Sequence, residues 1–69
     1  MTIRSYGRSE LAQLYFPLLQ PMNAWRCLQE WIKLNHELST KLKAMGYTPH
    51  KRILTPAQVK TIVYYLGEP

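Results

Sequence analysis

The stretch Pro21-Met-Asn-Ala-Trp-Arg-Cys-Leu-Gln-Glu-Trp-Ile-Lys-Leu34 decides the fold, because its apolar residues recur at the spacing of an α-helix. One side of this helix is apolar, with Ala24, Trp25, Leu28, Trp31 and Ile32. The other side is largely polar, with Asn23, Arg26, Gln29, Glu30 and Lys33. Proline suits the first turn of a helix, where its missing amide hydrogen needs no partner. The pattern predicts a helix over residues 21–34.

A shorter helix is predicted before it, over residues 8–16. Gly7 can cap its start, with Glu10 three residues later, and the apolar residues that follow fall at helical spacing. Pro17 ends it, because proline removes an amide donor and disfavours helix at the preceding residue. Residues 2–6 alternate polar and apolar side chains, which fits a short strand or an extended arm.

Two further helices are predicted towards the C-terminus. Asn35 is a good cap for a helix over residues 36–45, which Gly46 would end. Residues 47–54 contain Pro49 and the basic run His50-Lys-Arg52, and this composition predicts a turn, a small β-ribbon or a wing. Thr55-Pro-Ala-Gln58 is a capping box with proline at the first helical position, and it predicts a helix over 56–66.

Together these segments predict a mainly α fold: one compact four-helix domain over residues 1–69, with a helix-turn-helix-like first pair and a short β-ribbon or wing. Cys27 is the single cysteine, so no internal disulfide can form, and two distant histidines assemble no zinc site. No apolar run approaches the length of a membrane span or a signal peptide. We therefore expect a cytoplasmic protein without a metal, cofactor or membrane partner.

Enzymatic chemistry is not expected. The four glutamates form no recognisable acid/base pair, and neither His36 nor His50 has a nucleophile or metal partner at a known spacing. The three glycines fall at predicted helix boundaries instead of in a phosphate-binding loop. The sequence predicts a protein that is not an enzyme and has no small-molecule substrate.

The charge balance favours a polyanionic partner. Nine Lys and Arg residues against four acidic residues give a net charge of +5 and a pI near 9.7. Charge alone does not decide the partner, because many small domains carry excess lysine as a solvated face.

The polar side of the 21–34 helix predicts where DNA would bind. In a helix-turn-helix pair the second helix enters the major groove, where Asn and Gln can pair with adenine, Arg with guanine and Lys with phosphates. Other basic residues could clamp the flanking backbone. The predicted nucleic-acid-binding residues are Arg8, Asn23, Arg26, Gln29, Lys33, Lys51 and Arg52. The same residue types also fit an ordinary solvated helix face.

A rival prediction is a protein-interaction module. Trp25 and Trp31 are six residues apart and project from different sides of one helix, so one is expected in the core and the other at its edge. An exposed tryptophan can anchor a protein partner. Aromatic side chains around Tyr15, Phe16, Trp31 and Tyr65 would then mediate homodimer formation or bind another protein.

Several segments carry a resemblance to a known family. Arg4-Ser-Tyr6, Glu10-Leu-Ala12, Tyr15-Phe-Pro17 and the closing Tyr65-Leu-Gly-Glu-Pro69 resemble a family of small proteins from Bacteroidales described as a domain of unknown function. The resemblance covers nearly the whole chain and implies no activity.

A looser resemblance is to the winged helix-turn-helix domains of the MerR and excisionase type, which also begin with a short strand and a helix containing Glu-Leu-Ala. It implies a recognition helix in second place and a basic wing at Lys51 and Arg52, before Thr55-Pro56. The turn Tyr15-Phe-Pro-Leu-Leu19 is bulkier than is usual there, and the helix over 36–45 is an insertion.

Overall fold

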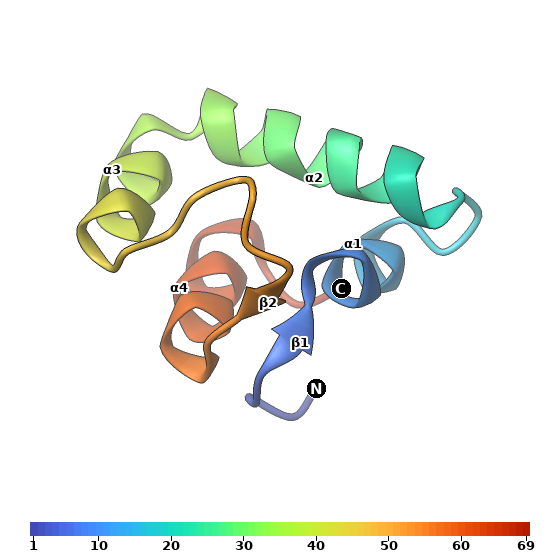
Figure 1. The fold of residues 1–69 in the computed structure, drawn as a ribbon, viewed down its shortest axis with the longest axis horizontal. Helices are drawn as coiled ribbons and strands as arrows, with labels where there is room; N and C mark the ends of the chain where they lie inside the picture. The colour runs from blue at the N-terminus through green and yellow to red at the C-terminus, as the bar shows by residue number, and fades with distance from the viewer.

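A computed structural model describes all residues, 1–69, and shows four helices and two short strands (Figure 1). In chain order the elements are β1 (Tyr6–Gly7), α1 (Arg8–Tyr15), α2 (Pro21–Leu34), α3 (His36–Ala44), β2 (Ile53–Leu54) and α4 (Pro56–Leu66). The predicted mainly α, four-helix fold is confirmed. All four helices begin where the sequence predicts, while α1 and α3 each end one residue earlier than predicted.

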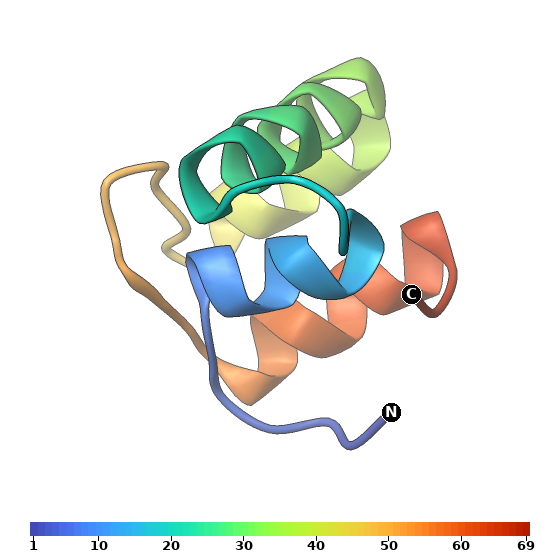
Figure 2. The same cartoon turned by 90° about the vertical axis from the view of Figure 1, so that its right-hand side faces the viewer.

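The β-ribbon joins the two ends of the chain. β1 pairs with β2 in antiparallel register, with Tyr6 opposite Leu54 and Gly7 opposite Ile53. Residues 47–54 therefore form no ribbon of their own, and in the predicted strand region, residues 2–6, only Tyr6 is in a strand. Because each strand leads into a helix and the two strands pair, α1 and α4 start on the same side of the molecule and run in a similar direction (Figure 2).

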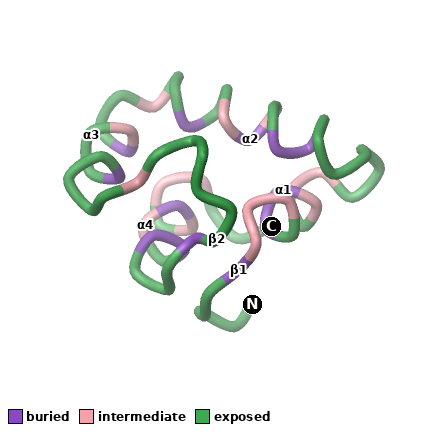
Figure 3. The backbone as a smooth tube through the Cα atoms, viewed as in Figure 1, coloured by how far each residue is buried: buried purple, intermediate pink, exposed green.

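Helix α2 lies across one side of the molecule and covers the core (Figures 1 and 3). Its side chains Ala24, Trp25, Leu28 and Ile32 are buried in a core that also contains residues from every other element. Trp25 is 6% exposed, whereas Trp31 is 42% exposed. The prediction that one tryptophan lies in the core and the other at its edge is confirmed. None of the helices has the length and apolar character needed to cross a membrane.

Asn35 and Gly46 fix the direction of the chain at the two ends of α3. Asn35 ends α2, and its side-chain oxygen accepts a hydrogen bond from the Leu38 amide at the start of α3 (3.0 Å). Gly46 ends α3 with φ of 81°, a left-handed conformation that glycine adopts without the strain a Cβ atom brings. The chain then runs to the start of α1, where the Pro49 and Arg52 carbonyls accept hydrogen bonds from Arg8.

Candidate nucleic-acid interface

The segment of residues 47–52, which we call the basic loop, is fastened at both ends and in the middle. The Tyr47 amide donates to the Leu42 carbonyl (3.0 Å), and the Lys51 amide donates to the Thr48 carbonyl (3.3 Å). Arg8 makes two further bonds: its Nη1 donates to the Pro49 carbonyl (2.6 Å) and its backbone amide to the Arg52 carbonyl (2.8 Å). The loop is therefore held in one conformation although it has no regular secondary structure.

Arg8 lies where α1, α2 and the basic loop meet. In addition to its bonds to the loop, its guanidinium carbon lies 5.6 Å from the ring centre of Trp25. A cation over a tryptophan face is attracted by the ring, by about 0.5–2 kcal/mol depending on exposure. Arg8, predicted from the sequence to bind phosphate, is half-buried and also holds the basic loop in place.

One flank of α2 faces the basic loop. Trp25, Gln29 and Lys33 follow each other at four-residue intervals, so they form one row along the helix. Gln29 and Lys33 line a cavity of about 150 Å³ together with Lys43 of α3 and Tyr47 of the loop. Burial raises the pKa of Tyr47, and the positive charge of Arg8 acts in the opposite direction. Arg8 and the α2 flank therefore both lie close to Tyr47 of the basic loop.

We call the residues gathered around this loop the basic face. It comprises Lys51 and Arg52 of the loop itself and the residues of the helices that border it, Arg8, Gln29, Lys33 and Lys43. Five of them are cationic, out of nine basic residues in the chain. Lys43, in the last turn of α3, is not among the residues predicted from the sequence.

Two predicted residues lie outside the basic face. Arg26 and Asn23 are exposed on α2, and their side chains make no hydrogen bond or ion pair. Arg26 precedes Gln29 by three residues and Lys33 by seven, so it borders the basic face. Asn23 precedes Gln29 by six residues and projects farther round the helix. The structure thus brings five of the seven predicted residues together and places Arg26 beside them.

No carboxylate is ion-paired with the basic face. Glu10 accepts from Arg4 (3.0 Å), Glu68 lies 3.6 Å from the N-terminal amine, and Glu37 accepts from the Tyr65 hydroxyl (3.0 Å). Glu30 is exposed on α2 without a partner. Glu10 is the one carboxylate that shares a surface depression with Arg8 and Arg52, and its charge is offset by Arg4. The positive charge of the basic face is therefore not neutralised by direct pairing.

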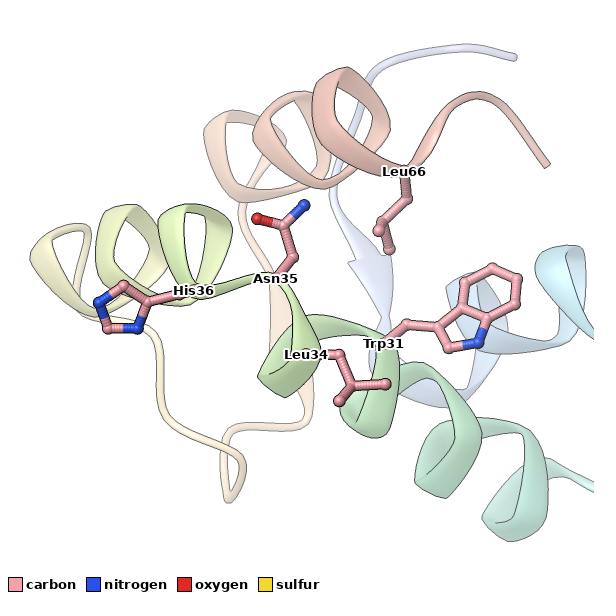
Figure 4. A pocket seen from close by; sticks show the side chains of 5 residues that line it. All are labelled: Trp31, Leu34, Asn35, His36 and Leu66. Atoms are coloured by element: carbon pink, nitrogen blue, oxygen red, sulfur yellow. The ribbon is translucent and has the colours of Figure 1, made fainter.

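A second, shallow depression of about 390 Å³ lies between the end of α2 and the end of α4 (Figure 4). Trp31, Leu34 and Leu66 supply its apolar lining. His36 also borders it, but its ring points away from Trp31 and Leu66 (Figure 4). The Asn35 oxygen is occupied by its helix cap. This pocket therefore offers apolar surface but no pair of groups arranged for proton transfer.

Trp31 also joins an aromatic cluster at the end of α1. Its ring packs edge-on against Phe16, with ring centres 4.7 Å apart, and against Tyr15, at 6.2 Å. Tyr15, Phe16 and Tyr65 are half-buried, so Trp31 is the most exposed of the four aromatic residues of the rival prediction. No group of three or more His, Cys, Asp or Glu side chains is placed to hold a metal ion.

A family model described as a domain of unknown function (DUF4248) matches residues 2–69 of the chain. The comparisons with curated proteins and with solved structures give no match.

Proposed function

The chain belongs to the family described as a domain of unknown function (DUF4248), and we propose that it binds DNA through the basic face. We further propose that it is a small accessory or regulatory protein of the cytoplasm in Bacteroidales, and that it binds DNA without catalysing a reaction.

The observation that carries the proposal is spatial convergence. Arg8, Lys33 and Lys43 come from three different helices and lie beside the anchored loop that carries Lys51 and Arg52. Phosphate groups on a duplex bind clustered Lys and Arg, and the counterions they release drive the association. A fixed loop loses little conformational freedom when it binds, so more of the attraction appears as affinity.

The proposed docking resembles that of winged helix-turn-helix domains. Helix α2 would lie in the major groove, with Arg26 and Gln29 towards the base edges, while the basic loop contacts the adjacent backbone where a wing would. The short connection between α1 and α2 and the exposed polar side of α2 support this arrangement.

The test is a fluorescence-anisotropy titration of duplex DNA at several salt concentrations. If about four phosphates are contacted, the logarithm of the association constant should fall against the logarithm of salt concentration with a slope of about −4. Absence of binding even at low salt would reject the proposal.

A matched pair of variants assigns the binding to the basic face. Lys33→Ala/Lys43→Ala removes two charges from it, and Lys41→Ala/Lys60→Ala removes two charges beside Tyr64 and Tyr65, at another depression of the surface. Both variants have the same net charge. We expect the first to make the slope shallower by about 2 and the second to leave it unchanged. Equal losses in both variants would mean that net charge, and not this face, governs binding.

A second candidate function is self-association through the apolar surface around Trp31. Leu34 is 81% exposed beside this tryptophan, and exposed aromatic and aliphatic side chains are typical anchors of protein interfaces. Light scattering after size-exclusion chromatography tests this function: a dimer that Leu34→Glu converts to a monomer supports it. A wild-type monomer at high concentration rejects it.

A further inference from the structure

The cavity of about 150 Å³ beside the basic loop is a small built site at the junction of α2, α3 and that loop. Its apolar lining comes from Ile32, which is 3% exposed, and from Tyr47 and Pro49. Its polar lining comes from Gln29 and Ser39, and Lys33 and Lys43 add two exposed ammonium groups. This lining favours a ligand that has an apolar part with hydrogen-bonding groups at its edge and a negative charge next to it.

The size of the cavity limits the ligand to one ring. Pockets for drug-sized molecules and cofactors run from about 300 to 1,000 Å³, well above this volume. A cavity of about 150 Å³ lined by apolar side chains holds a single aromatic ring. A complete dinucleotide or a larger cofactor therefore does not fit.

The chemistry of the lining selects the kind of ring. A phosphate group placed inside would lose its hydration against Ile32 and Pro49, which is costly. A flat heteroaromatic ring can stack on the Tyr47 side chain, while the Gln29 amide and the Ser39 hydroxyl can each donate or accept hydrogen bonds at its edge. We propose that this cavity receives one unpaired nucleobase of a bound nucleic acid, whose flanking phosphate is held by Lys33 and Lys43.

The site is formed before any ligand binds. Gly46, with φ of 81°, directs the chain out of α3 so that the Tyr47 amide bonds to the Leu42 carbonyl. Arg8 then holds Pro49 through its carbonyl. Because two lining residues are fixed by backbone hydrogen bonds, an entering base meets an ordered surface and little ordering cost is added.

This inference rests on the proposed DNA binding and adds to it a preference for DNA that contains an unpaired base. The test compares three duplexes of one sequence: fully paired, with one bulged deoxycytidine, whose base is a single ring, and with an abasic residue at the bulge. Stacking of one base adds roughly five- to hundredfold in affinity, so the bulged duplex should bind more tightly than the abasic one by that factor.

Two variants at Ser39 test whether the cavity causes the difference in affinity between the bulged and the abasic duplex. Ser39→Leu fills the space with a good helix-forming residue, and Ser39→Ala removes only the hydroxyl. We expect Ser39→Leu to abolish the preference for the bulged over the abasic duplex and to leave affinity for the paired duplex unchanged. Ser39→Ala should retain most of the preference, and far-UV circular dichroism checks that both variants fold.

A measurement on the wild-type chain needs no variant. Cytidine 5′-monophosphate should shift the NMR amide signals of Ser39 and Tyr47, and ribose 5-phosphate, which has the phosphate but no base, should not. If the bulged and abasic duplexes bind equally, or the signals do not move, the base-binding cavity is wrong while DNA binding stands. If no duplex binds but cytidine 5′-monophosphate shifts these signals, the DNA-binding proposal fails and the base-binding cavity stands.

Discussion

Glu10 connects two parts of the chain through one carboxylate. Its Oε1 accepts a hydrogen bond from the Gly7 amide (3.1 Å), which satisfies a free donor at the start of α1. Its Oε2 accepts from Arg4 (3.0 Å), which ties the N-terminal segment to the helix. The Arg4 hydrogen bond, and after it that of Gly7, lowers the pKa of Glu10. A single exposed side chain thereby makes stability depend on pH.

We expect the free energy of unfolding to vary less with pH in Glu10→Gln than in the wild type. A carboxyl whose pKa is lowered in the folded state stabilises that state above the ordinary carboxyl range and loses the contribution as the pH falls through the lowered pKa. The advantage of the wild type over Glu10→Gln should therefore be largest near neutral pH and vanish in acid. Urea unfolding at a series of pH values measures it. Glu30→Gln is the control, and a pH dependence of the same size there would contradict the assignment.

At the scale of elements, the chain contains two strand–helix units that begin alike. In β2–α4, Thr55 Oγ1 accepts from the Gln58 amide (3.2 Å) and Gln58 Oε1 accepts from the Thr55 amide (3.0 Å). In β1–α1, Glu10 supplies the second of these bonds, but Gly7 has no side chain to supply the first. The two units are joined because their strands pair. One of them therefore starts its helix with a complete capping box, and the other with only half of one.

Opposite changes in stability are expected at the two caps. Thr55→Ala should lower the free energy of unfolding by about 1 kcal/mol because the Gln58 amide loses its acceptor. Gly7→Ser should raise it by a few tenths of a kcal/mol, since serine is preferred over glycine at this position. A Cβ atom at Gly7 would lie 3.7 Å from Glu10 Cβ, an ordinary contact. Thermal unfolding measures both, and a destabilised Gly7→Ser variant would contradict the comparison.

At the scale of the whole molecule, closure depends on contacts between segments distant in sequence. The β1–β2 pair, the bonds of Arg8 to residues 49 and 52, and the bond from the Tyr15 hydroxyl to the Gly67 carbonyl (2.5 Å) all join the first sixteen residues to the last third of the chain. A domain of this size buries only about 60% of the surface that its unfolded chain exposes. Such contacts therefore make up a large part of a thin stability margin.

We expect Arg8→Met to loosen the basic loop. Methionine retains much of the apolar stem but loses the hydrogen bond to Pro49 and the attraction to Trp25, at a cost of about 1 kcal/mol in unfolding free energy. Hydrogen exchange at the Lys51 amide, which reports the loop turn, should accelerate. Arg26→Met is the control because the Arg26 side chain makes no hydrogen bond or ion pair. Equal exchange rates in the two variants would show that Arg8 does not hold the loop.

The candidate site could be predicted from the sequence only in part. Residue types and helical spacing selected Arg8, Gln29 and Lys33, because each stands on a helix whose period is visible in the sequence. Lys43 could not be selected, since its relevance depends on where the irregular segment 47–52 returns, and that segment has no period to follow. Asn23 was selected for its type, and the rotation of α2 against the core leaves it apart from the basic face.

The sequence by itself determined the four helices and their starting residues, since caps, prolines and apolar spacing act within a few residues of each helix end. Only the tertiary structure decided that Ile53 and Leu54 pair with the N-terminal segment, that Trp25 and not Trp31 enters the core, and that the basic loop lies beside α2. These outcomes follow from which surfaces bury together most favourably, a property of the folded chain as a whole that local spacing does not encode.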